Sequence, residues 1–443
     1  MRTRKWIKRY GTTALLLYGS CFALQAQDSH QQVLQLEKIW ELALENNQVL
    51  KVEEAGVQVA AQQIQVSKLN QLPTVNTSLN VAYLGDVNIL DKDFSNTTTV
   101  AMPHFGNSFT LQAQQLLFKG YTVRKTIQLA DLQYQLSQLQ KEAAVQEIKL
   151  LVTGIYLDLF SLYNQQQVYT KNIELAKVRL KNTEAMHKQD LVTRDDIIRT
   201  RLMLADLQIA REQVENSIRI LNHQLTTATG LEQSVTIVPD TTILQNKSEL
   251  KHLNAYLNDA GDNNQELLLS KKKVQIAEKG LSITKSELSP SFSLFAANNL
   301  QRPLTSSTPV LDQYSNSWQV GAAVSFDISS VYKVNRKKEL SRLRLIQSQE
   351  AVRAKEESVT VEVNSAFIKY NESIQQLQSF EENKILANEN YRMIEKKYDH
   401  QLAPLLDLLH ASNSKLAAEL QFSNAEINIL FAYYKLLKTT GLL

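Results

Sequence analysis

Residues 72–86 read "LPTVNTSLNVAYLGD", and from Val75 onward their side chains alternate between two faces. One face holds Val75, Thr77, Leu79, Val81 and Tyr83, and the other holds Asn76, Ser78, Asn80 and Ala82. A period of two is typical of a strand whose faces meet different solvents. Only four such stretches occur, at 74–84, 108–118, 291–301 and 317–327, in a sequence that is otherwise helical in character. We therefore expect a mostly α chain with four β-strands.

Residues that break helices are scarce. The 443-residue chain holds 12 Gly and 7 Pro, and residues 121–229 contain one Gly, Gly154, and no Pro. Long uninterrupted helices use few turn residues, so this composition favours them.

The N-terminus, "MRTRKWIKRYGTTALLLYGSCFALQAQ", has a basic head, an apolar stretch and a small residue at Ala26. This predicts a secretory signal peptide over residues 1–26. Its removal takes five of the 48 basic side chains and none of the 45 acidic ones, so the mature chain is nearly neutral, which argues against a nucleic-acid partner. Cys21 lies within the signal behind a poor lipobox, Tyr18-Gly19-Ser20, so we expect neither lipidation nor disulfides.

The chain repeats one pattern. Asn46-Asn47 and Pro73 recur 217 residues later, while Asp196 and Thr229-Gly230-Leu231 recur 211 residues later. The sequence therefore predicts an internally duplicated chain. The first repeat is expected at 27–231 and the second at 250–443, and the linker 232–249 between them is expected to wrap the middle of the helices.

Each repeat is expected to contain a helix, a β-hairpin, a long helix and a further helix. In the first repeat these are 35–72, 74–118, 121–189 and 191–229; in the second they are 250–289, 291–327, 331–399 and 402–440. A 69-residue helix is about 100 Å long, close to two of the shorter helices laid end to end. Such equal lengths are suited to a layer of parallel and antiparallel helices that is equally tall along its whole width.

Residues 402–440 carry two apolar stripes, one of them lined by Ala411, Ala418, Ala425 and Ala432. Two stripes indicate neighbours on both sides of a helix, as in a curved helical wall. A helix buried in a solid bundle is the alternative.

The strands have the length and the apolar and polar faces of tilted membrane strands around a wet lumen. Four strands cannot close a barrel, and lipid does not tolerate an open sheet edge. Three chains would supply twelve strands. We therefore expect a membrane protein whose barrel is shared between copies, with the loops 85–107 and 302–316 outside and the helices in the periplasm.

These features resemble the TolC family of outer-membrane efflux proteins over essentially the whole mature chain. The resemblance rests on the opening "LEKIWELALENNQVLKVEEAGVQVAAQQIQVSKLNQLPTV", the passage "LLFKGYTVRK", the motifs "QDLVTRDDIIRTRLMLADLQIA" and "HQLAPLLDLLHASNSKLAAE", and the TGL that closes each repeat.

The resemblance implies a homotrimer in the outer membrane of a Gram-negative bacterium, with a twelve-strand β-barrel continued by a twelve-helix α-barrel in the periplasm. Such a protein is the exit duct of a tripartite efflux or secretion system. Its partners are outer-membrane lipid, a periplasmic adaptor (membrane fusion protein) and an inner-membrane transporter of the resistance-nodulation-division or ABC type. The transporter supplies the energy, so no catalysis and no cofactor are expected.

The family's periplasmic tip motif also has counterparts here. Asp196 and Asp407 match its acidic position, and the adaptor-contact turns correspond to Asp190, Leu191 and Thr193 in the first repeat and to Gln401, Leu402 and Pro404 in the second. Both turns lack the family's usual Gly. Asp190 can adopt a left-handed conformation at modest cost, and Gln401 less readily.

Asp407 and His410 are three residues apart and so share a helix face. We hypothesise that in a trimer they form a cation-favouring, pH-sensitive gate, because His titrates near neutrality. A solvated helix face is the alternative. The seven His residues show no metal-ligand spacing, and we expect no metal site.

Two other classes of protein remain open. A periplasmic adaptor also uses long helical hairpins, but it would carry one hairpin between lipoyl-like halves. A soluble coiled-coil scaffold would have no pore. The sequence does not identify the transported substrate.

Overall fold

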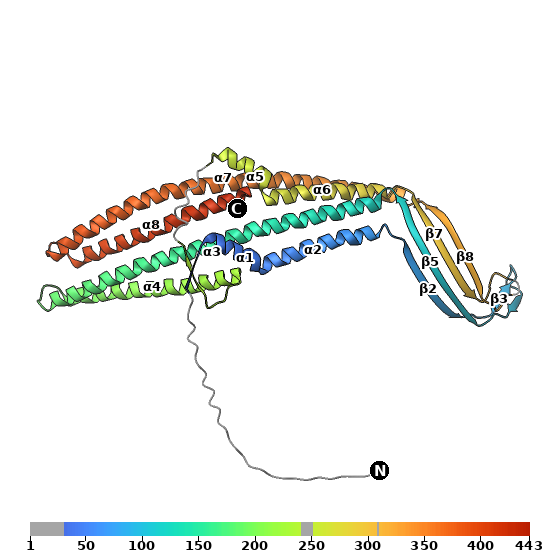
Figure 1. Cartoon of the computed structure of the whole chain (residues 1–443), viewed down its shortest axis with the longest axis horizontal. Helices are drawn as coiled ribbons and strands as arrows, with labels where there is room; N and C mark the ends of the chain where they lie inside the picture. The colour runs from blue at the N-terminus through green and yellow to red at the C-terminus, as the bar shows by residue number, and fades with distance from the viewer. Residues whose placement is uncertain (1–30, 241–250, 308–309) are drawn as a thin grey trace, which may run out of the picture.

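The computed structural model describes residues 31–240, 251–307 and 310–443. It shows a long rod of helices with a four-stranded sheet inclined to it at one end (Figure 1). The expected signal peptide, with Cys21, lies outside the described residues.

Two long helices run the length of the rod, and shorter helices flank them (Figure 1). The helices are α1 (Leu36–Asn46), α2 (Gln48–Leu69), α3 (Thr122–His187), α4 (Arg194–Thr229), α5 (Leu253–Asn263), α6 (Gln265–Ser286), α7 (Ser330–Asp399) and α8 (Leu405–Thr440). Helix α3 packs against α2, α4, α6 and α8, and α7 packs against α5, α6 and α8. In the described ranges, no helix combines the length and the apolar character needed to span a bilayer.

The helices expected over 35–72 and 250–289 are each divided in two, so that part of the prediction is wrong. Asn47 is extended, with φ −64° and ψ 127°, and its side chain accepts a hydrogen bond from the Val49 amide at 2.9 Å. Asn264 has the same conformation and caps α6 through the Leu267 amide at 3.0 Å. Asn is among the best helix N-caps, so each Asn begins a new helix that a continuous apolar pattern conceals.

The four long strands of the expected pattern are present and form one antiparallel sheet in the order β2-β5-β7-β8. They are β2 (Thr74–Tyr83), β5 (Phe105–Lys119), β7 (Ser291–Arg302) and β8 (Ser315–Ser325). Strand β5 begins three residues before the expected 108.

The register gives the sheet one polar and one apolar face. One row across the strands contains Ser78, Thr110, Asn299 and Ser317, and the Thr110 hydroxyl donates to Asn299 Oδ1 at 3.1 Å. A row on the opposite face contains Val75, Ala113, Ala296 and Val320. The alternation read from the sequence therefore continues across all four strands.

Phe295 interrupts the polar face and packs against Gly321 on the neighbouring strand. A Cβ atom built on Gly321 would lie 2.8 Å from Phe295 Cζ. The aromatic ring therefore fills the space that glycine leaves open, as in the aromatic rescue of glycines in other sheets.

Four further strands make the expected number of four wrong. They are β1 (Gln31–Leu34), β3 (Val87–Leu90), β4 (Thr97–Val100) and β6 (Thr236–Pro239), each four residues long. So short a strand shows too few alternations to be recognised in a sequence. Strands β3 and β4 form a hairpin beyond the far end of the sheet, within the loop 85–107 (Figure 1).

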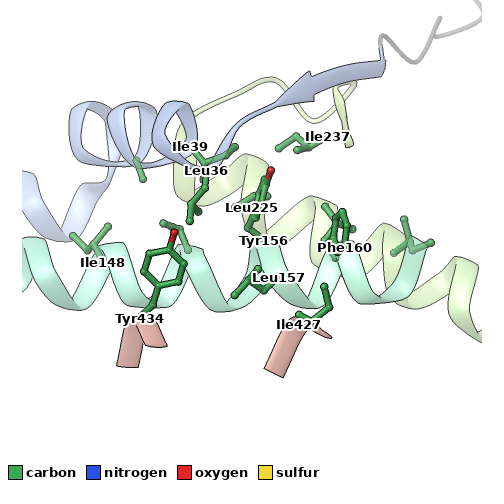
Figure 2. Close-up of a cluster of buried hydrophobic side chains, with 14 of the residues drawn as sticks. Leu36, Ile39, Ile148, Tyr156, Leu157, Phe160, Leu225, Ile237, Ile427 and Tyr434 are labelled. Carbon is green, nitrogen blue, oxygen red and sulfur yellow. The ribbon is translucent and has the colours of Figure 1, made fainter. Parts of the chain in front are cut away.

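Strands β1 and β6 pair in parallel at the middle of the rod, so the described part of the 232–249 linker lies there. The C-terminal ends of both strands are tied to α3 through Tyr156. Its hydroxyl donates to the Leu34 carbonyl and accepts from the Asp240 amide, each at 2.8 Å. A buried apolar cluster surrounds this joint (Figure 2). It brings together Leu36 and Ile39 of α1, Tyr156, Leu157 and Phe160 of α3, Leu225 of α4, Ile237 of β6, and Ile427 and Tyr434 of α8.

Candidate functional site

The turn between α3 and α4 lies at the end of the rod opposite the sheet (Figure 1). Asp190 has φ +57°, the Asp190 amide donates to the His187 carbonyl, and the Leu191 amide donates to the Met186 carbonyl, both at 3.0 Å. This pair of hydrogen bonds around a left-handed residue is a Schellman motif.

The turn between α7 and α8 has the same geometry at the same end of the rod. Gln401 has φ +62°, its amide donates to the Tyr398 carbonyl at 2.9 Å, and the Leu402 amide donates to the Lys397 carbonyl at 2.7 Å. Both turns therefore keep a left-handed residue although neither contains Gly. A left-handed conformation costs an L-residue about 1–2 kcal/mol, and Asp accepts it more readily than Gln.

Each turn exposes one large apolar side chain. Leu191 is 48% exposed and Leu402 is 76% exposed. Pro404, the N-cap residue of α8, is also exposed. The two tips thus present equivalent leucines at equivalent positions of the two turns.

Asp196 holds the first turn of α4. Its carboxylate accepts hydrogen bonds from the Thr193 amide and the Thr193 hydroxyl, both at 2.8 Å, and the Asp196 amide donates to the Thr193 hydroxyl at 3.3 Å. This is a reciprocal capping box. Asp196 and Thr193 are therefore brought together, and the carboxylate proposed for the tip is engaged in helix capping.

Asp407 and His410 differ from Asp196. Both are exposed on the first turns of α8, and neither side chain has a hydrogen bond or ion pair with the part of the chain that the structure describes. They are therefore free to face a lumen or bulk water. The His187 ring, by contrast, lies 2.9 Å through Nδ1 from the Val192 carbonyl and belongs to its turn.

A polar contact that the sequence did not reveal joins the two pairs of helices near the tips. The buried Arg179 of α3 donates through Nη2 to the hydroxyl of Tyr391 on α7 at 2.8 Å. Burial raises the pKa of Tyr391 to about 12. Lys415 Nζ of α8 lies 4.7 Å from the centre of the Tyr391 ring. A charged residue in a predicted helix normally indicates a solvated face, so the sequence pattern did not mark Arg179 as buried.

The sheet has two open edges. Strands β2 and β8 each pair with one neighbour within the described residues, and both carry exposed apolar side chains. Leu79 is 70% exposed, Trp318 78% and Val320 72%. No group of three or more His, Cys, Asp or Glu side chains in the described ranges could hold a metal ion.

The family model described as "Outer membrane efflux protein" matches residues 39–231 and 256–442. Outer membrane efflux protein BepC of Brucella suis biovar 1 (strain 1330) is 23% identical over 446 residues, covering 99% of this chain and 91% of that protein. The outer membrane protein VceC of Vibrio cholerae superposes with a TM-score of 0.73 at 14% identity, covering 92% of this chain and 96% of VceC.

The open state of the MtrE outer membrane channel of Neisseria gonorrhoeae superposes with a TM-score of 0.71 at 16% identity, covering 92% of this chain and 89% of that channel. The structures show a shared fold, and the family model covers most of the sequence. The chain therefore belongs to the outer membrane efflux protein family, the TolC family that the sequence resembles.

Proposed function

We propose that three copies of this chain form an exit duct through the outer membrane and the periplasm. The observation that carries the proposal is a sheet with a polar face, an apolar face and two open edges, β2 and β8. Strands β2 and β8 are antiparallel in this order, so β8 of one copy can pair with β2 of the next and close a twelve-stranded barrel. The apolar face then meets lipid and the polar face lines the lumen.

The helices would continue this barrel as a twelve-helix wall built from a duplicated chain. The duplication is supported by equal lengths: α1 and α5 have 11 residues each, α2 and α6 have 22, and α4 and α8 have 36. The two family matches, 39–231 and 256–442, also divide the chain into halves. These halves correspond to the repeats expected at 27–231 and 250–443.

At the other end of the duct, the two tips would meet a periplasmic adaptor fed by an inner-membrane transporter of the resistance-nodulation-division or ABC type. The exposed Leu191 and Leu402, each at the same position of a Schellman turn, are suited to apolar docking of adaptor helices. The duct itself requires no chemical step, because the transporter supplies the energy. The family match favours this role over a periplasmic adaptor or a soluble scaffold.

The trimer is tested by disulfide crosslinking between strands. With Cys21 expected to leave with the signal, Ser78→Cys on β2 and either Ser317→Cys or Gln319→Cys on β8 introduce the only thiols, all on the polar face. Within one chain β2 and β8 are three strand spacings apart, about 14 Å, which is beyond disulfide reach. Oxidation in outer-membrane fractions should yield a covalent species of three chains from at least one double variant and none from the single variants. Monomers alone would reject the shared barrel.

The gate is tested separately. Asp407 and His410, three residues apart on an exposed helix face, would place three carboxylates and three imidazoles around a narrow opening. Single-channel recordings of Asp407→Ala and His410→Ala should show reduced cation preference and a lost pH dependence, respectively. Unchanged selectivity and pH response in both variants would reject the gate without affecting the duct.

A further inference from the structure

Charged side chains are distributed unevenly between the two ends of the sheet. We define the junction zone as the residues where strands and helices meet: 66–73, 119–128, 284–290 and 327–339. Its basic residues are Lys68, Lys119, Arg124, Lys125, Lys285, Lys333, Arg336, Lys337 and Lys338, and its acidic residues are Glu287, Asp327 and Glu339. The opposite end, 84–107 and 302–316, has Lys92 and Arg302 against Asp86, Asp91, Asp93 and Asp312. The junction zone thus carries +6 and the loop end −2.

Three cations at the start of α7 form no ion pair with a carboxylate. Lys333, Arg336 and Lys338 are exposed, and none forms an ion pair with a described residue. Of the three acidic residues in the junction zone, Glu287 accepts from Lys337 at 2.6 Å, and Asp327 accepts from the Ser329 hydroxyl at 2.7 Å while the charge of Lys333 helps to lower its pKa. Glu339 forms no ion pair with a described residue, so even with Asp327 and Glu339 counted the start of α7 carries an excess of positive charge.

An apolar belt lies next to these cations. Ile328 is 77% exposed, Tyr332 68%, Tyr121 64%, Leu72 60% and Val331 51%. Apolar and aromatic side chains followed by cations are typical of the boundary between hydrocarbon and headgroups.

The spacing along α7 fits the thickness of a headgroup layer. Lys338 is six residues beyond Tyr332, which corresponds to about 9 Å along a helix. The headgroup region on one side of a bilayer is roughly 5–8 Å thick. Lys333 and Arg336, about 1.5 Å and about 6 Å beyond Tyr332 on the same scale, lie within this layer, and Lys338 lies at its outer limit. Arg342 and Arg344 lie about 15–18 Å from Tyr332 on the same scale and so beyond that layer.

Assembly would not neutralise the three cations. In the proposed trimer, α7 of one copy lies beside α2 of the next, and residues 55–72 contain no Asp or Glu. Glu53 and Glu54, about 15 residues from the end of α2 at Leu69, would lie level with Arg344 instead. The neighbouring α2 therefore supplies no carboxylate that could pair with the three cations in the assembled duct.

We propose that the junction zone binds the anionic phospholipid headgroups of the membrane leaflet that faces the helices. This inference rests on the proposed trimer in the membrane. Phosphate groups would neutralise Lys333, Arg336 and Lys338, while the apolar belt contacts the acyl chains beneath them.

The experiment compares lipid binding to purified trimers in detergent by native mass spectrometry, with phosphatidylglycerol and phosphatidylcholine as the probes. The test variant is Lys333→Gln/Arg336→Gln/Lys338→Gln. The matched control, Arg342→Gln/Arg344→Gln/Arg392→Gln, removes three exposed charges without an ion pair from the same helix farther from the sheet. One cation near an anionic surface contributes about fivefold in binding, so the test variant should lose at least about tenfold in phosphatidylglycerol affinity. The control should retain most of it.

Equal affinity of the wild-type trimer for the two lipids would overturn the proposal, as would an equal loss in the control. A test variant that binds phosphatidylglycerol normally but changes ion selectivity in phosphatidylcholine bilayers would show that the cations line the conduction path, which also overturns it. If the test variant does not assemble, the wild-type trimer is tested at low and high salt instead. An electrostatic preference for phosphatidylglycerol must weaken at high salt, and a preference that does not weaken would overturn the proposal. Unheated gels report the trimer first: absence of a wild-type trimer contradicts the proposed function, whereas a trimer indifferent to lipid charge contradicts only this inference.

Discussion

Gly441, at the end of α8, lies directly against the backbone of Asn263 at the end of α5. Gly441 has φ +79°, and a Cβ atom built on it would overlap the Asn263 carbonyl group. The Asn264 side chain completes the joint by donating to the Thr439 carbonyl at 2.9 Å. Both occurrences of the TGL motif therefore pack against an Asn pair, but with different contacts: Gly441 faces the Asn263 backbone, whereas Gly230 faces the Asn46 side chain.

We expect Gly441→Ala to lower the free energy of unfolding by about 3 kcal/mol or more, because left-handed strain and a backbone overlap add together. Thermal melting of the purified protein measures the change. Gly280→Ala on α6 is the control, since no atom lies within 4 Å of its added methyl group, and it should stabilise by about 0.5–1 kcal/mol. Equal stability of the two variants would contradict the packing described.

Tyr391→Phe removes a hydroxyl that accepts from the buried Arg179 and donates to Glu395 Oε1. A hydrogen bond to a charged group contributes about 1.5–3 kcal/mol, so the variant should lose stability by that amount in urea unfolding. Tyr169→Phe is the control, because the Tyr169 hydroxyl has no hydrogen bond to the described residues. An equally large loss of stability in Tyr169→Phe would show that removing a tyrosine hydroxyl, and not the loss of its hydrogen bonds, causes the effect.

Gln401→Gly should stabilise the turn between α7 and α8 by about 1 kcal/mol, because Gly adopts φ +62° without strain. Asp190→Gly should gain less, since Asp tolerates the left-handed region better. Melting temperatures of the two variants, measured side by side, test which substitution stabilises more. A gain confined to Asp190→Gly would contradict the prediction.

Asp196→Ala should cost about 1 kcal/mol through loss of the capping box at the start of α4. Asp407→Ala should leave stability nearly unchanged, because its carboxylate has no hydrogen bond within the described chain. Chemical denaturation separates the two aspartates. A larger loss in Asp407→Ala would show that Asp407 has a structural partner.

Three buried tyrosines predict a fall in stability at high pH. Burial raises the pKa of Tyr156, Tyr391 and Tyr434 to about 12 each. The unfolded phenol ionises near 10, so the stabilisation is complete below pH 10 and is lost as pH rises towards 12. Each group contributes up to roughly 3 kcal/mol. Tyr156→Phe should flatten this pH dependence in equilibrium unfolding, and an unchanged slope would contradict the assignment.

The long strands and long helices could be predicted because their patterns extend over many residues. Ten or more alternating residues identified β2, and the absence of Pro from 121–229 identified α3 and α4. Boundaries set by a single side chain could not be read in this way. Asn47 and Asn264 were visible as a repeated pair, but their capping role depends on backbone conformation.

At the tips, the sequence located the turns but not the role of each residue. Asp196 and Asp407 occupy equivalent positions, yet only Asp196 has a hydroxyl three residues earlier; Pro404 stands where Thr193 caps α4. That difference is visible in the sequence, and it distinguishes an aspartate that caps a helix from one whose carboxylate has no hydrogen bond in the described chain. Arg179 could not be assigned, because its partner Tyr391 is 212 residues away in the chain.

The β3–β4 hairpin projects from the far end of the sheet (Figure 1). If the sheet crosses the outer membrane as proposed, antibodies and bacteriophages would encounter this hairpin first. Its pairing is separate from the ladder of the four long strands, so residues at its turn could change under such attack without disturbing the barrel. The same separation makes Lys92–Asn96 a suitable place to insert an epitope for display on living cells.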